Sequence, residues 1–480
     1  MRKVLKKIII SIFLLLLLLL LYIILFKTDQ VYILKRESVN ISKILVIALD
    51  LIFIFLYVVL VQRKDISIKR YYVLLTIIQA LFLIIQLTIL LNIRFDTSWD
   101  VESIRNAVNT YIKNGSITNN DYLTKYPNNL LLVGILSVLA KLPLIGKYYL
   151  TTLIFNTLIV NLSVLFISLS VKNFHSNKAG ILVYIFLIPL ILLNPWFIIP
   201  YSDTFALFFI SIITYIYSKK EKDNKDIFLI IFLSIFGAFI KPMVIIPLIS
   251  IIICEFIYKD IIITKDYKKY ITIILSIIVA ILIKDGFINI LHFTPVKDKY
   301  STTVFHFLAM GQNPTTSGFY NYMDEMNSYN LGYKYDINQF KKRFKINLEQ
   351  GQLKFITNKI LISFGDGSFA WGLYGTFFPE IESIKNPKNI FQEIYYEKGK
   401  YYNNYLNTSN LIWFCLLLFL PFILLKGVNK NELFLVTSFI GIFLFILIFE
   451  TCSRYLYCFS GILIVITFLA INKIYDILKN

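Results

Sequence analysis

The sequence predicts an all-α polytopic membrane protein with about twelve transmembrane helices. The chain is 57% hydrophobic, and its mean hydropathy is +0.70. Only 16% of its 480 residues are charged, whereas soluble proteins carry about 25%. Residues 8–26 form a 19-residue apolar run without a charge, close to the roughly 20 residues that cross a bilayer. These three observations exclude an ordinary soluble enzyme.

Twelve apolar runs are candidates for spanning helices. The first has no small-residue cleavage site, so we interpret it as a retained helix and not as a signal peptide. The runs lie at residues 8–26, 44–61, 71–93, 148–171, 179–199, 204–218, 227–240, 242–258, 270–290, 411–425, 433–449 and 455–472. They divide the chain into a three-helix segment (1–93), a first large outer loop (94–147), a six-helix core (148–290), an extracytoplasmic region of short helices (291–410) and a C-terminal three-helix segment (411–480).

A formal charge of +19 would suggest a nucleic-acid-binding protein, but the positions of the Lys and Arg residues along the chain indicate membrane topology instead. With both termini inside, the seven cytoplasmic segments contain 22 Lys and Arg, and the four short outer loops contain 5. This asymmetry is typical of the positive-inside rule. We therefore expect membrane lipids and not nucleic acid as partners, with both termini cytoplasmic and the large loops outside.

A thirteenth apolar stretch, residues 129–140, would invert every later helix if it crossed. It would then place the lysine-rich loops 219–226 and 259–269 outside, against the charge rule. We therefore expect a helix that lies in the outer interface or re-enters the membrane.

Cysteine and histidine spacing indicates neither a disulfide framework nor a metal centre. The four cysteines include no CxxC pair, and the three histidines show no HxxH or HExxH spacing.

The first large outer loop contains two acids that could act as a general base. Asp96 and Asp100 are four residues apart and would share one face of a helix that begins here. Asp100 follows Trp99 at the start of an amphipathic pattern, which would hold it against the membrane interface. Desolvation there raises a carboxyl pKa, as suits a general base. The alternative is that Ser98 or Asp100 simply caps the helix.

A second outer acid, Asp203, follows Tyr201 in the segment PYSD. The loop is only three or four residues long, so both flanking helices would hold Asp203 at the membrane face. Ser202 or Asp203 as a helix cap is the alternative. Two acids from separate outer loops form a better candidate site than either acid alone.

Basic residues lie at the same expected surface. Lys241 occupies the turn between two short helices, and Arg454, followed by Tyr455, begins the last helix. Cations at the lipid boundary bind phosphate well, although anchoring by snorkelling is the alternative. An intramembrane acid, Asp50, is functional by default, but the sequence suggests no partner for it.

Two polar turns could bind a sugar. Tyr126, Asn128 and Asn129 form a turn before the stretch at 129–140, where Asn128 could instead be a helix cap. Asn321 and Asp324 follow a glycine-rich turn, where Asp324 could instead be a solvated loop acid.

The order of these motifs resembles the GT-C superfamily of integral membrane glycosyltransferases, which includes protein O-mannosyltransferases and bacterial aminoarabinose transferases. The motifs are WD at 99–100, YPNN at 126–129, PYSD at 200–203, KP at 241–242, the glycine- and asparagine-rich stretch 310–324, and SRY at 453–455. They cover most of the chain from residue 94 onward. They look most like a branch from low-GC Gram-positive bacteria, which implies the bacterial plasma membrane.

The resemblance implies a polyprenyl-phosphate sugar donor and an inverting transfer. Asp100 would match the first-loop acid that deprotonates the acceptor hydroxyl, and Asp203 the second-loop acid that orients the acceptor or a metal. Lys241 and Arg454 would stabilise the phosphate that leaves. This chain lacks the family's adjacent Asp-Glu pair in the first loop. The choice between Asp96 and Asp100, and the need for a divalent cation, therefore stay open.

The expected function is thus glycosyl transfer to an extracytoplasmic glycan, a lipid-linked acceptor or a teichoic-acid-like polymer of the cell envelope. One alternative is a polysaccharide polymerase or ligase. The other is a transporter or flippase for a lipid-linked sugar, which would be expected to show broken helices and buried charges at the midplane.

Overall fold

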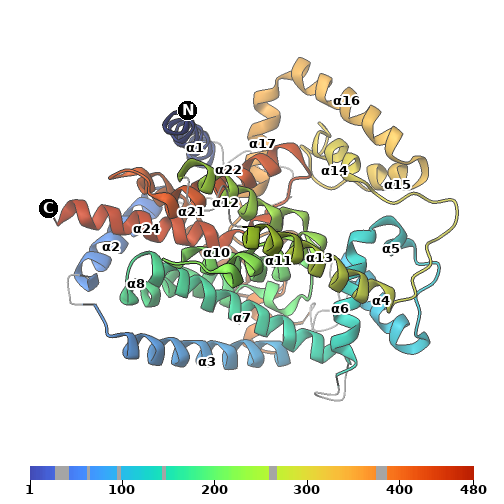
Figure 1. Ribbon diagram of the computed structural model, residues 1–480, viewed down its shortest axis with the longest axis horizontal. Helices are drawn as coiled ribbons and strands as arrows, with labels where there is room; N and C mark the ends of the chain where they lie inside the picture. The colour runs from blue at the N-terminus through green and yellow to red at the C-terminus, as the bar shows by residue number, and fades with distance from the viewer. Residues whose placement is uncertain are drawn as a thin grey trace.

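The computed structural model is a helical bundle with a group of short helices at one end (Figure 1). It describes residues 1–26, 43–61, 65–93, 99–142, 148–258, 267–374 and 386–479. Within these ranges the sole β pairing is an isolated bridge between Thr118 and Thr294. The expected all-α class is therefore confirmed.

Seven of the described helical segments are long and apolar enough to cross a membrane. They are α1 (Arg2–Phe26), α3 (Ile68–Asn92), α7 (Tyr148–Phe174), α13 (Tyr267–Asn289), α21 (Tyr402–Phe419) with η8 (Leu420–Leu424), α22 (Lys430–Ile448) and α24 (Ser460–Leu478). The other expected ranges are also helical: α2 (Lys43–Val61), α8 (Asn177–Leu182) with the segments after it, α10 (Ser202–Ser218), α11 (Asn224–Ile240), and α12 (Ile245–Tyr258) after η6 (Pro242–Val244). The number of crossings, twelve, stays a prediction.

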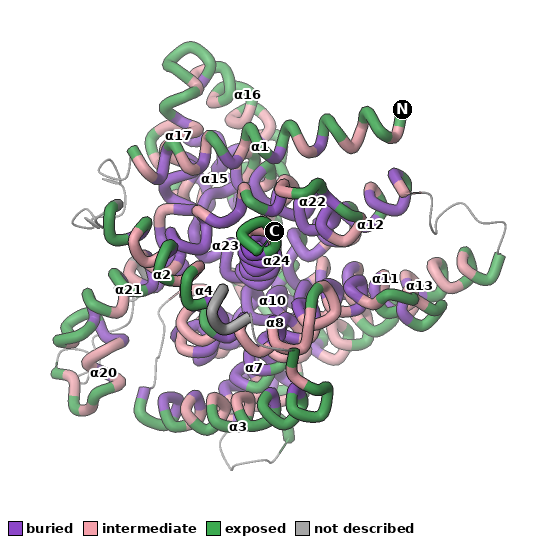
Figure 2. Tube along the Cα trace, turned by 90° about the vertical axis from the view of Figure 1, so that its left-hand side faces the viewer, coloured by how far each residue is buried: buried purple, intermediate pink, exposed green. Residues whose placement is uncertain are grey.

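The centre of the bundle is formed by α10, α23 (Arg454–Tyr457) and α24 (Figure 2). Fourteen residues of α10 are buried, and so is every residue of α24 from Ser460 to Asn472. Polar groups that start these helices are consequently held deep in the protein. This matters because two of the expected site residues lie there.

The range expected to form the fifth span is broken into four pieces. They are α8, α9 (Tyr184–Leu187), a π-helical turn η4 (Ile188–Leu192) and η5 (Pro195–Ile198). Pro189 and Pro195 lack an N–H donor, which interrupts the ladder of helical hydrogen bonds. A side chain binds two backbone carbonyls at the end of this segment: Asn156 of α7 donates to Phe197 O at 2.7 Å and to Ile199 O at 3.1 Å. Asn156 thereby fixes the chain just before Pro200.

The stretch 129–140 forms η3 (Pro127–Asn129) and the eleven-residue α6 (Leu130–Ala140). At 1.5 Å per residue, α6 is about 16 Å long, roughly half of the hydrocarbon thickness. It packs against α4 (Asp100–Asn114), α7 and α13. A Cβ on Gly134 would lie 2.3 Å from Phe287 O, so α6 and α13 approach backbone to backbone.

Loops that the charge rule assigns to one side of the membrane contact one another. Asp65 Oδ1 accepts from the backbone N–H of Lys178 at 2.8 Å. Lys6 Nζ donates to Val428 O at 2.6 Å, and Lys473 Nζ lies 2.9 Å from Glu432 Oε2. These segments therefore form one end of the bundle, which we expect to be cytoplasmic.

The described part of 291–410 consists of short helices on the opposite end. They are α14 (Val304–Gly311), α15 (Tyr322–Leu331), α16 (Tyr333–Gln350), α17 (Gln352–Phe364), α18 (Trp371–Tyr374) and α20 (Ile390–Tyr395). Phe364 of α17 packs against Phe439 and Phe443 of α22, so this region is joined to the bundle.

A buried ion pair at the expected cytoplasmic end provides a stability test. Lys430 Nζ lies 2.7 Å from Glu255 Oε1, which also accepts from Tyr217 at 3.1 Å. We expect Lys430→Met to destabilise the protein by about 3–5 kcal/mol, because it leaves a buried carboxylate without its cation. The double variant Glu255→Met, Lys430→Met should regain most of this loss. The measurement is thermal unfolding in detergent, and a double variant no more stable than the single one would contradict the prediction.

Candidate functional site

The candidate site lies where four chain turns meet at the end opposite the termini. These are the start of α4, the turn before α10, the residue after α11 and the start of α23. Two of the expected acids, Asp100 and Asp203, come from the first two turns. Two of the expected cations, Lys241 and Arg454, come from the other two.

Asp203 is the anionic centre of this cluster. Its side chain is fully buried, and Lys241 Nζ donates to Oδ1 at 2.7 Å. Arg454 Nε lies 3.5 Å from Oδ2. The N-cap residue of α10 is Tyr201, and no side chain caps this helix. The interpretation of Ser202 or Asp203 as a cap is therefore wrong, because the carboxylate of Asp203 binds cations.

Aromatic rings surround the guanidinium of Arg454. Its central carbon lies 4.8 Å from the Trp99 ring centroid, 5.1 Å from that of Tyr201 and 5.8 Å from that of Trp196. Lys241 Nζ lies 4.7 Å from the centroid of Tyr455. Such cation–π contacts strengthen when the cation is desolvated. Lys241 and Arg454 are only 8% and 5% exposed, so neither snorkels to water.

Asp100 lies beside this cation cluster and starts α4. Tyr201 Oη donates to Asp100 Oδ2 at 2.9 Å. Burial among protein atoms raises the pKa of Asp100, whereas the charge of Arg454 and the hydrogen bond of Tyr201 oppose the rise. Part of Asp100 nevertheless stays accessible. The N-cap residue of α4 is Trp99, without a side-chain cap, so Asp100 is not the cap.

Asp96 and Ser98 lie outside the described residues. The choice between Asp96 and Asp100 as the base therefore stays open.

Tyr126, Asn128 and Asn129 lie on the turn between α5 (Asp121–Lys125) and α6. Asn129 Nδ2 donates to Tyr122 Oη at 2.7 Å, and the rings of Tyr122 and Tyr126 are 5.4 Å apart. Burial, with a smaller contribution from the charge of Asp100, raises the pKa of Tyr122 well above its usual value. Asn128 is half-buried and caps no helix, so its interpretation as a cap is wrong.

Three charged residues that the sequence analysis did not single out join the site. Glu325 Oε1 lies 2.5 Å from Lys125 Nζ, and Tyr320 donates to the other carboxylate oxygen. Burial raises the pKa of Glu450, and a hydrogen bond from Tyr455 opposes the rise. The one sequence signal for Glu450 was its place in the same short outer loop as Arg454. The one signal for Glu325 was that it is adjacent to Asp324, which had been singled out.

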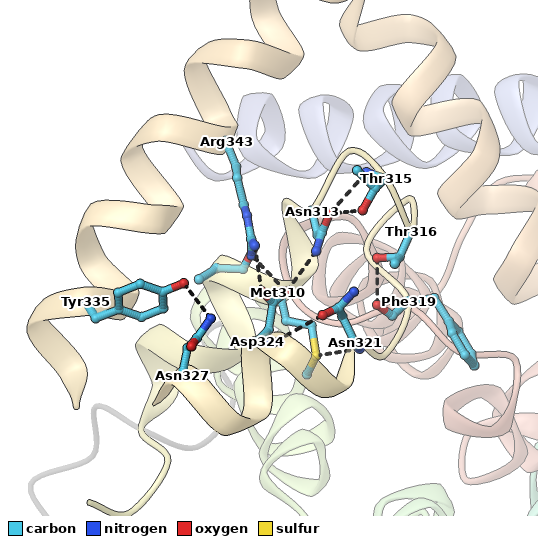
Figure 3. A network of polar contacts seen from close by, with 11 residues as sticks. Met310, Asn313, Thr315, Thr316, Phe319, Asn321, Asp324, Asn327, Tyr335 and Arg343 are labelled. Carbon is cyan, nitrogen blue, oxygen red and sulfur yellow. Dashed lines mark hydrogen bonds and ion pairs between the residues drawn. The ribbon is translucent and has the colours of Figure 1, made fainter. Parts of the chain in front are cut away.

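Asn321 and Asp324 belong to a separate network that joins α14, α15 and α16 (Figure 3). Asn321 is the N-cap of α15 and accepts from the backbone N–H of Asp324. Arg343 of α16 donates to both Asp324 oxygens, at 2.6 and 2.9 Å, and Asn313 donates to one of them at 2.8 Å. Asp324 is 7% exposed, so the alternative of a solvated loop acid is wrong.

The start of α23 is held by the glycine-rich turn 364–372. Ser453 Oγ donates to Asp366 Oδ2 at 3.0 Å, and Ala370 N donates to the same oxygen at 2.7 Å. On the other side of Glu450, the fully buried Lys359 donates to Phe449 O at 2.7 Å and to Gly311 O at 2.6 Å. Arg454 and Glu450 are thereby fixed from two sides.

An apolar cavity lies next to Asp100 and Tyr201 along the chain, between α4, α6, α7 and the turn before α10. Its lining residues are Val101, Ile104, Arg105, Val108, Asn109, Leu136, Ala140, Thr152 and Pro200. Most of these lining side chains are aliphatic.

No group of three or more His, Cys, Asp or Glu residues in the described ranges could hold a metal ion. The acids of the site are paired with lysine, arginine or tyrosine instead. The described residues do not fit the divalent cation that the resemblance left open.

The apolar helices and their buried centre define an integral membrane protein. More particularly, the chain belongs to the family described as conserved hypothetical integral membrane protein, whose family model matches residues 1–475. No curated protein and no solved structure matches it.

The charge cluster at Asp203 provides a second stability test. We expect Asp203→Asn to destabilise the protein by about 3–5 kcal/mol, because two buried cations would lose their counter-charge. The matched control is Asp285→Asn, which breaks a partly exposed pair with Lys284 and should cost less than about 1 kcal/mol. Thermal unfolding of both variants in detergent compares them, and equal destabilisation would contradict the central role of Asp203.

Proposed function

We propose that the protein is an inverting GT-C-type glycosyltransferase that takes a sugar from a polyprenyl-phosphate donor. The observation that carries this proposal is the position of an accessible, poorly solvated carboxyl group, Asp100, near the buried guanidinium of Arg454, which Asp203 holds and to which Tyr201 links Asp100. A base and an anion-binding group side by side are what such a transfer requires.

Asp100 is the proposed general base. It removes the proton from the acceptor hydroxyl, and the acceptor oxygen then forms a bond to the anomeric carbon. The bond from this carbon to the phosphate oxygen breaks at the same time, and its electron pair stays on the phosphate. Attack opposite to the leaving group inverts the anomeric centre. The raised pKa of Asp100 makes it a stronger base than an ordinary aspartate.

Arg454 and Lys241 are proposed to bind the phosphate of the donor and of the leaving group. Both are buried and already held in place, so they need little reorganisation when charge develops. The aliphatic side chains of α4 and α6 that line the small cavity would flank the lipid next to the phosphate. The rings of Tyr122 and Tyr126 would contact the sugar or the acceptor.

The acceptor is proposed to be an extracytoplasmic glycan, a lipid-linked saccharide or a teichoic-acid-like polymer of the bacterial cell envelope. A polymerase or ligase would use the same groups on a growing chain, and product length distinguishes it from a single transfer. The broken segment from α8 to η5 and the buried Asp50 favour a flippase as the second candidate.

We expect Asp100→Asn to lower the rate of transfer by about 10²–10⁴-fold, because a general base is lost. Glu102→Gln is the matched control, since Glu102 lies on the same first turn of α4 with its side chain 39% exposed. The assay uses membranes that contain each variant and a panel of polyprenyl-phosphate sugars labelled in the sugar. Full activity of Asp100→Asn would reject the base, and label that changes leaflet without covalent transfer would favour the flippase.

The pH dependence of transfer tests the same assignment. Activity requires ionised Asp100, so the rate should fall as the pH drops through a pKa above the usual value of about 4. Tyr201→Phe removes a hydrogen bond that favours the ionised carboxylate, so the midpoint should move up by about one pH unit. The measurement is kcat/KM against pH for both proteins. A midpoint that stays in place, or moves down, would contradict the role of Tyr201.

A further inference from the structure

Helix α16 has its polar contacts on the protein side and exposes two large apolar side chains on its flank, next to an outer side of lysines. Arg343 binds Asp324, Asp336 accepts from Ser328 at 2.8 Å, and Asn347 donates to Gln312 O at 3.0 Å. Figure 3 shows Arg343 directed into this network. A surface helix in water differs, because the side that it turns to the protein is apolar.

The exposed side combines large apolar residues with lysines. Phe344 is 43% exposed and Leu348 is 57% exposed, and they are neighbours on one face because they are four residues apart. Lys341 and Lys345 are exposed and lie next to this face, and Lys345 also forms a loose, exposed ion pair with Glu349 at 3.8 Å. Figures 1 and 2 place α16 at the periphery of the molecule, where no other described helix covers it. An apolar stripe flanked by lysines is typical of a helix that lies on an anionic membrane.

The next helix places the end of α16 near the membrane surface. Lys359 of α17 donates to Phe449 O, directly after the end of α22, so these two points lie at the same depth. Leu353 is six residues before Lys359 and is therefore about 9 Å away along the helix. The headgroup layer is about 5–8 Å thick on each side of the hydrocarbon core. Leu353 is 77% exposed, which adds a large apolar side chain at this level.

We propose that the outer face of α16 and the start of α17 dock onto the anionic headgroup layer of the bilayer that the bundle crosses. Phe344, Leu348 and Leu353 would enter the boundary between headgroups and acyl chains. Lys341 and Lys345 would bind lipid phosphates. This contact would hold the short-helix region, which includes Glu325, at the membrane surface. If the proposed function is correct, a lipid-linked substrate enters at this surface.

The test places a fluorescent label on single cysteines of the full-length protein in proteoliposomes. The four native cysteines are buried, which directs the label to an introduced Phe344→Cys or Leu348→Cys. Glu349→Cys is the matched control, since position 349 is exposed on the same helix about 140° from Phe344. Lipids that carry a quencher in the acyl chain should quench the label at 344 and 348 several-fold more than at 349, in vesicles with 30% phosphatidylglycerol.

Charge dependence completes the test. Each lysine removed, as in Lys341→Gln and Lys345→Gln, should weaken docking about fivefold, and pure phosphatidylcholine should give little quenching. Equal quenching at 344 and 349 would overturn the proposal. Equal quenching in zwitterionic and anionic vesicles would also overturn the proposal. So would a label at position 344 that becomes shielded from solvent only after soluble polyphosphate is added.

Discussion

The pairing of Asp203 with two buried cations is the interaction on which the rest of this end of the structure depends. Lys241 and Arg454 are drawn from turns more than 200 residues apart, and neither could stay desolvated without a nearby anion. Asp203 can serve both because its helix begins in the buried centre of the bundle. The pair therefore fixes the start of α10, the turn after α11 and the start of α23 relative to one another.

This arrangement also explains why so many aromatic residues gather at the site. A guanidinium that leaves water needs compensation beyond one carboxylate at 3.5 Å, and ring faces provide it without adding negative charge. Trp99 and Tyr201 contribute their rings to Arg454, and Tyr201 also donates to Asp100. Tyr201 thus connects the cation cluster to the proposed base. A substitution in the cation cluster should therefore change the surroundings of Asp100, and the reverse.

The spans and the outer acids could be predicted because hydropathy and charge placement act locally along the chain. The turns that carry Asp100, Asp203, Lys241 and Arg454 all lie at ends of apolar runs, where the sequence marks them. The capping interpretations of Asp203 and Asn128 failed because a cap depends on local sequence, whereas tertiary contacts decide what these side chains bind. The break between α8 and η5 was missed because the run is uniformly apolar despite its prolines.

The region after α13 was the least predictable. Its polar side chains are paired with one another across short helices, as in the contact of Arg343 with Asp324, and no periodic pattern records such pairs. Glu325 was missed for the same reason, because its partner Lys125 lies 200 residues earlier. The place of Glu450 in the loop of Arg454 was not enough to predict its role, since an acid at the end of a spanning helix is also a common interfacial residue.

The balance of charges in the assembled site constrains how it could work. The described residues contribute four acids, Asp100, Asp203, Glu325 and Glu450, against three cations, Lys125, Lys241 and Arg454, which leaves one formal negative charge when all are ionised. The raised pKa values of Asp100 and Glu450 offer a way to remove that excess, because either can hold a proton at little cost. In the proposed reaction, an entering phosphate diester would add another negative charge and would favour protonation further. If Asp100 is the base, Glu450 is therefore the acid best placed to stay protonated while Asp100 ionises, since like charges in one poorly solvated site push their pKa values apart.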